Sequence, residues 1–84
     1  MDRINQKTIY NQIYNLLLNN GEYFRPHFNG MFDSDDDICY EISHMVQRVS
    51  FGHPIEYCKK PTQEFHNELM SLVTQYIKYI NYID

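Results

Sequence analysis

Apolar side chains recur at helical spacing in three segments of the chain, and polar segments that contain glycine or proline separate them. In the first segment the steps are four, three and one residues, at Ile9, Ile13, Leu16 and Leu17. Such spacing places the side chains on one face of an α-helix. Gly21 follows and is the expected stop, because glycine adopts the left-handed conformation at little cost. The pattern predicts a helix from about residue 5 to residue 20.

The second segment has the clearest start. Ser34 can cap a helix, and three aspartates occupy the first turn, where carboxylates favour the positive end of the helix dipole. An amphipathic stripe then follows at Ile38, Ile42, Met45, Val46 and Val49. Gly52 and Pro54 end it. The prediction is a helix over residues 34–51.

The third segment is the longest and the most apolar. Pro61 suits a first helical turn and Thr62 can cap the helix. The main stripe comprises Phe65, Leu69, Leu72, Tyr76, Ile80 and Ile83. The prediction is a helix over residues 61–83. A strand over residues 75–83 is the alternative, because Tyr and Ile favour strands, although the spacing of three and four favours the helix.

More apolar side chains flank the main stripe of the third helix, at Val73, Ile77, Tyr79 and Tyr82. Two shorter helices can cover only one side of such a helix, and exposed apolar patches on a protein usually mark contacts. We therefore expect a homodimer whose interface these four residues form, since a two-fold dimer closes one patch with its own copy.

The elements together predict one small all-α domain over residues 1–84, with three helices and an aromatic loop between the first two. The chain has 84 residues, and a core of that size is thin. The longest apolar run is Leu16-Leu17-Leu18, so no segment is expected to span a membrane. The start of the chain shows no apolar signal region, so a cytoplasmic location with reduced Cys39 and Cys58 is expected.

The net charge of −4 is concentrated in the middle of the chain. Residues 31–58 carry a net charge of −5, whereas residues 1–30 carry +1 and residues 59–84 carry none. Direct binding to nucleic acid needs clustered Lys and Arg to neutralise phosphates, and the seven basic residues here are scattered. A small DNA-binding regulator is therefore disfavoured.

The loop aromatics and the neighbouring carboxylates form the predicted partner-binding surface. A core this small cannot bury all eight Tyr and five Phe, and aromatic residues are enriched at interfaces. The carboxylates either serve only as a charged helix start or meet a basic patch on a partner, in one version by imitating the phosphates of DNA. The predicted surface comprises Tyr23, Phe24, Phe28, Phe32, Asp33, Asp35, Asp36, Asp37 and Glu41.

Metal, cofactor and catalytic motifs are incomplete. Asp33, Asp35 and Asp37 have the spacing that opens a calcium loop, but Ile38 and His44 stand where that loop needs glycine and glutamate. The spacing of His53, Cys58 and His66 does not match paired zinc ligands. No nucleophile elbow, glycine-rich phosphate loop or metalloprotease helix occurs. We expect no metal, no cofactor and no enzymatic activity.

The composition adds a hypothesis about the source. The chain has no alanine, and the residue types with AT-rich codons, Ile, Asn, Tyr, Lys and Phe, together make up 34 of its 84 residues. A short chain from an AT-rich genome fits a bacteriophage, although an AT-rich cellular genome gives the same bias. The predicted function is a small phage-encoded inhibitor that binds and blocks a host protein of the nucleic-acid machinery or a defence nuclease. The alternative is a structural or assembly protein that acts by self-association.

Overall fold

The structure of the chain, a computed structural model, describes residues 2–24 and 34–83, with side chains described for residues 6–24 and 34–80. It contains α1 (Asp2–Asn19), a short 3-10 turn η1 (Gly21–Tyr23), α2 (Asp35–Ser50) and α3 (Gln63–Ile83). The described residues contain no β-strand. The all-α prediction is confirmed, and the segment with the strand alternative, residues 75–83, is helical.

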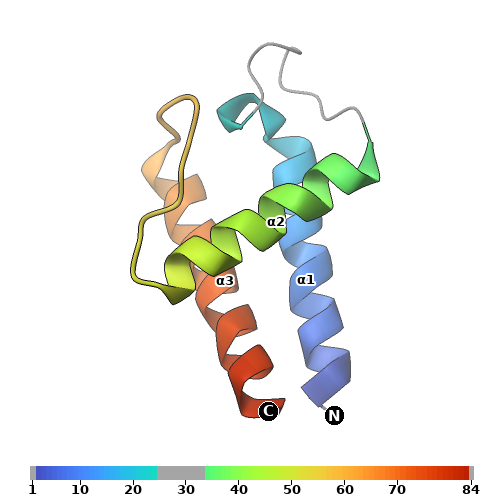
Figure 1. Cartoon of the computed structure of the whole chain (residues 1–84). Helices are drawn as coiled ribbons and strands as arrows, with labels where there is room; N and C mark the ends of the chain where they lie inside the picture. The colour runs from blue at the N-terminus through green and yellow to red at the C-terminus, as the bar shows by residue number, and fades with distance from the viewer. Residues whose placement is uncertain (1, 25–33, 84) are drawn as a thin grey trace.

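The three helices form two layers. α1 and α3 lie side by side and run in opposite directions, so the two ends of the chain lie at the same end of the molecule (Figure 1). α2 crosses the face of this pair, with its start over α1 and its end over α3 (Figure 1). The core therefore lies where the apolar stripes of all three helices meet.

The core is built largely from the predicted stripes. Its buried side chains are Ile9, Ile13, Leu17, Tyr23, Phe24, Ile38, Ile42, Met45, Ile55, Phe65, Leu69 and Val73. On α3 the buried positions run along Phe65, Leu69 and Val73, one helical turn apart, while Leu72 and Tyr76 are half-buried. The buried stripe of α3 is therefore centred to one side of the predicted one, because α1 and α2 cover that side.

The helix ends show which local signals act as predicted. The backbone N–H of Phe65 donates to the Thr62 hydroxyl at 3.2 Å, so Thr62 caps α3 as predicted. Ser34 occupies the cap position of α2 with an extended backbone, but its side chain makes no capping hydrogen bond. The start of α2 thus relies on its three aspartates rather than on a hydroxyl cap.

Gly52 ends α2 through a backbone conformation that glycine favours. Its φ is +84°, the left-handed region. The N–H of His53 donates to the Arg48 carbonyl at 2.8 Å and that of Gly52 donates to the Val49 carbonyl at 3.0 Å. This paired pattern is the Schellman motif, which satisfies carbonyls that the helix end leaves open.

Gly21 follows the end of α1 for a different reason than predicted. Gly21 does not adopt the left-handed conformation, because among the described glycines it is Gly52 that has a positive φ. Gly21 is buried and opens the 3-10 turn, where its carbonyl accepts the N–H of Phe24 at 2.9 Å. The Asn20 side chain donates to the Leu16 carbonyl at 2.9 Å and so caps the end of α1.

The connection between α2 and α3 returns across η1 and closes the aromatic end of the core. The Cys58 N–H donates to the Tyr23 carbonyl at 2.7 Å, and the Cys58 thiol donates to the Phe24 carbonyl at 3.1 Å. The Tyr23 and Phe65 ring centroids are 4.8 Å apart, and those of Phe24 and Tyr57 are 5.4 Å apart. The backbone bonds therefore hold the rings in a packed cluster.

Candidate protein-binding surface

The start of α2 presents carboxylates of two kinds. Asp35 and Asp36 are exposed, whereas Asp37 and Glu41 are half-buried and already interact within the protein. The Tyr14 hydroxyl of α1 donates a hydrogen bond to Asp35, and this bond raises the pKa of Tyr14. Asp35 thus also ties α2 to α1, and Asp36 is the aspartate most available to a partner.

Two aromatic side chains on the outer side of α2 are strongly exposed. Tyr40 is 71% exposed and Phe51, which ends the helix, is 72% exposed. Asp36, Tyr40 and Gln47 are exposed and follow at helical spacing, so they share the face of α2 that points away from the core. The Tyr40 ring lies parallel to the His44 imidazole, with an interplanar angle of 6° and ring centroids 6.3 Å apart.

Tyr40 and Phe51 are not among the predicted site residues, although the spacing of the sequence indicates that Tyr40 is exposed. The stripe of α2 runs through Ile38 and Ile42, and Tyr40 lies two residues from each, on the opposite face of a helix. An aromatic residue off the stripe of a clearly amphipathic helix is expected to face solvent. The predicted surface instead took its aromatic part from the loop.

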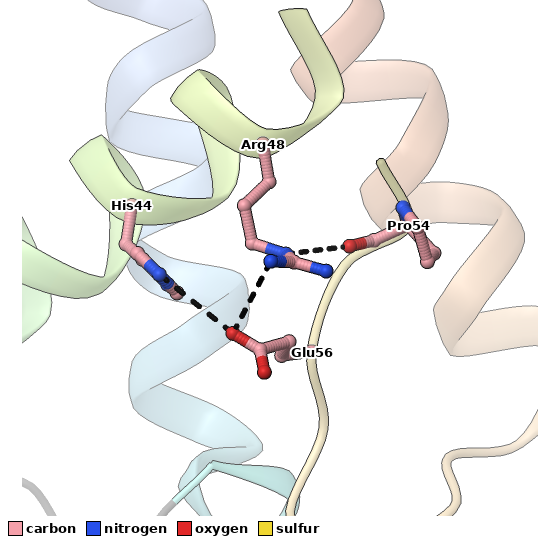
Figure 2. A network of polar contacts seen from close by, with 4 residues as sticks. All are labelled: His44, Arg48, Pro54 and Glu56. Carbon is pink, nitrogen blue, oxygen red and sulfur yellow. Dashed lines mark hydrogen bonds and ion pairs between the residues drawn. The ribbon is translucent and has the colours of Figure 1, made fainter. Parts of the chain in front are cut away.

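A polar network holds the loop after α2 against the helix (Figure 2). The Arg48 Nε donates to the Pro54 carbonyl at 2.9 Å, and Arg48 Nη1 lies 3.6 Å from the Oε1 atom of the Glu56 carboxylate. The same oxygen lies 3.7 Å from His44 Nε2 (Figure 2). The His44 ring is therefore fixed between Tyr40 and Glu56, and Arg48 is engaged within the chain.

The structure separates the predicted partner-binding residues into three groups. Asp35, Asp36, Asp37 and Glu41 lie together at the start of α2, as the sequence predicts. Tyr23 and Phe24 are 9% and 5% exposed, and they are core residues rather than surface anchors because the returning loop covers them. The remaining predicted residues, Phe28, Phe32 and Asp33, lie outside the described residues.

The predicted dimer residues are mostly used inside the chain. Val73 is 0% exposed and belongs to the core that the three helices enclose. Ile77 and Tyr79 are half-buried and pack against the core, and the Tyr82 side chain lies outside the described side chains. The apolar width of α3 that motivated a dimer is thus largely covered by the chain's own helices.

Several other polar side chains contact one another in pairs. Tyr57 Oη and His66 Nδ1 are 2.8 Å apart, and burial raises the pKa of Tyr57 to about 12. Burial, followed by a hydrogen bond with Cys39, raises the pKa of Tyr10. Cys39 and Cys58 are free thiols. Among the described residues, no three His, Cys, Asp or Glu side chains are grouped to hold a metal ion.

The grooves on the surface are open and shallow. One of about 310 Å³ follows the contact between α1 and α3 and is lined by Gln12, Asn15, Leu16, Asn19, Glu68 and Leu72. Another of about 500 Å³ lies on α3 alone and includes Met70 and Lys78. Within the described part of the chain, no helix has both the length and the apolar character needed to cross a bilayer.

Comparison with known proteins returned no family model, no curated protein and no solved structure that matches the chain.

Proposed function

We propose that this protein works by binding another protein that has a basic surface, and that it blocks the contacts of that protein. Its finer form is a small phage-encoded inhibitor whose target belongs to the host nucleic-acid machinery or is a defence nuclease. The observation that carries the proposal is the outer face of α2, where the 71%-exposed Tyr40 lies one turn from the exposed Asp36. Neither side chain is needed to fill the core.

The charge of this region supports a basic partner. The described residues 34–58 contain Asp35, Asp36, Asp37, Glu41 and Glu56 against a single Arg48. Opposite charges steer encounter and reject partners of the same sign. An aromatic ring beside the charges supplies contact area with a polar handle, as is typical of protein interfaces. The face combines attraction at long range with packing at short range.

The test is a charge reversal at Asp36, because Asp35, Asp37 and Glu41 have interactions of their own. Wild-type protein immobilised on beads should capture one stoichiometric partner from a bacterial lysate. The Asp36→Lys variant should bind that purified partner at least tenfold more weakly, since like charges across an interface cost several kcal/mol.

The matched control is Glu68→Lys, which changes the net charge equally at an exposed position in the middle of α3. It should keep wild-type affinity, and both variants should keep wild-type helicity by circular dichroism. Equal weakening by both variants would show that only net charge matters. Self-association without any captured partner would instead support the assembly protein.

A further inference from the structure

The ring of Tyr40 is placed to receive a flat cationic group. It lies parallel to the His44 ring, with centroids 6.3 Å apart, and 71% of the residue is exposed. His44 Nε2 in turn lies 3.7 Å from a carboxylate oxygen of Glu56 in the loop after α2 (Figure 2).

Asp36 lies where such a group would find its counter-charge. Asp36 and Tyr40 are four residues apart on α2 and therefore neighbours on one face. A cation resting on the ring would thus lie beside the carboxylate.

We propose that the partner contributes an arginine that stacks on Tyr40 and pairs with Asp36; this inference rests on the proposed function and specifies its partner. The guanidinium group is planar, stacks on aromatic faces and forms two parallel hydrogen bonds with one carboxylate. The ammonium of lysine is a strongly hydrated point charge and does neither as well. The site therefore discriminates between two residues of equal charge.

A second copy of the chain is a poorer occupant than a separate basic protein. The chain has three arginines, and Arg48 already donates to the Pro54 carbonyl and contacts Glu56. The face itself carries excess negative charge, so two such faces repel each other. Charge complementarity thus selects a partner segment richer in arginine than this chain is.

The experiment uses two synthetic probe peptides of equal length and charge, in which glycine alternates with four arginines or with four lysines. The full chain, labelled with ¹⁵N, is titrated with each peptide at low salt, and affinity is measured from amide chemical shifts. The arginine peptide should bind about two- to fivefold more tightly than the lysine peptide, as expected for an exposed cation–π contact, and should shift the amides around Asp36 and Tyr40.

Variants assign the preference to its residues. Tyr40→Leu keeps an apolar side chain but removes the ring face, and it should reduce the preference for arginine to the part that pairing with Asp36 supplies. Asp36→Asn should weaken both peptides, and Thr74→Ala, at an exposed position on α3 away from this face, should change neither.

Three results would overturn the inference. Equal binding of both peptides to the wild-type chain refutes the arginine site and leaves a basic partner possible. A preference for arginine that is as large in Tyr40→Leu as in the wild type refutes the role of Tyr40. Absence of binding by either peptide counts against both the arginine site and the proposed function.

Discussion

Val73 provides a sharp test of how α3 is covered, because its burial in the core and its predicted place in a dimer interface lead to different results. The side chain is 0% exposed. Val73→Ala removes two buried carbons, at about 0.8 kcal/mol each, and the cavity left behind adds to that loss. We expect the free energy of unfolding to fall by about 2–3 kcal/mol.

This loss is large for such a small domain. A stability of about 0.05–0.15 kcal/mol per residue corresponds to roughly 4–13 kcal/mol for a chain of this length. The measurement is urea unfolding followed by circular dichroism, with wild type and variant compared at equal slope. Thr74→Ala is the matched control, since threonine has the shape of valine and Thr74 is exposed. It should leave stability unchanged or raise it by about 0.5 kcal/mol, because alanine is the better helix former.

Protein concentration separates the two roles of Val73. If Val73 packs within one chain, the urea midpoint of unfolding stays constant across a hundredfold range of protein concentration. The loss of unfolding free energy in Val73→Ala stays constant as well. A midpoint that rises with concentration indicates that association contributes to stability. A loss below about 1 kcal/mol in Val73→Ala, or one that depends on concentration, would refute the core assignment and restore the dimer interface.

Two further predictions concern single contacts. Thr62→Ala should lower the free energy of unfolding in urea by about 1 kcal/mol, because it removes the hydroxyl that accepts the Phe65 N–H. Ser34→Ala should lower it by less than about 0.5 kcal/mol, because the Ser34 hydroxyl makes no capping bond. Equal losses in the two variants would show that the two caps do not differ. The pKa of Tyr57 is raised to about 12 in the folded protein from an ordinary value of about 10, so the unfolded chain loses its proton first as pH rises. The free energy of unfolding should therefore not depend on Tyr57 below pH 10 and should decrease between about pH 10 and 12. Tyr57→Phe should lower the free energy of unfolding at pH 8 but make its decrease above pH 10 shallower. An equally steep decrease in the variant would show that Tyr57 does not cause it.

The sequence by itself determined where the three helices lie. Helix ends depend on local chemistry, and Gly52 and Thr62 act as expected, at a left-handed residue and at a hydroxyl cap. α2 and α3 begin one or two residues inside the predicted ranges, and α1 begins at Asp2 rather than near residue 5, since neither proline nor glycine interrupts the chain there. The acidic start of α2 also follows from the sequence, because residues adjacent in the chain stay together in a helix.

Only the tertiary structure decided which aromatic and apolar side chains are covered. Tyr23 and Phe24 follow α1 at the start of the aromatic connection, and they are buried because the loop around Cys58, more than thirty residues later, bonds to their carbonyls and covers them. Val73 belongs to the core rather than to a surface because α1 and α2 together pack on that side of α3. A helix with a wide apolar stripe can turn either flank inward, and the crossing of its neighbours, which depends on contacts between distant residues, selects one of them.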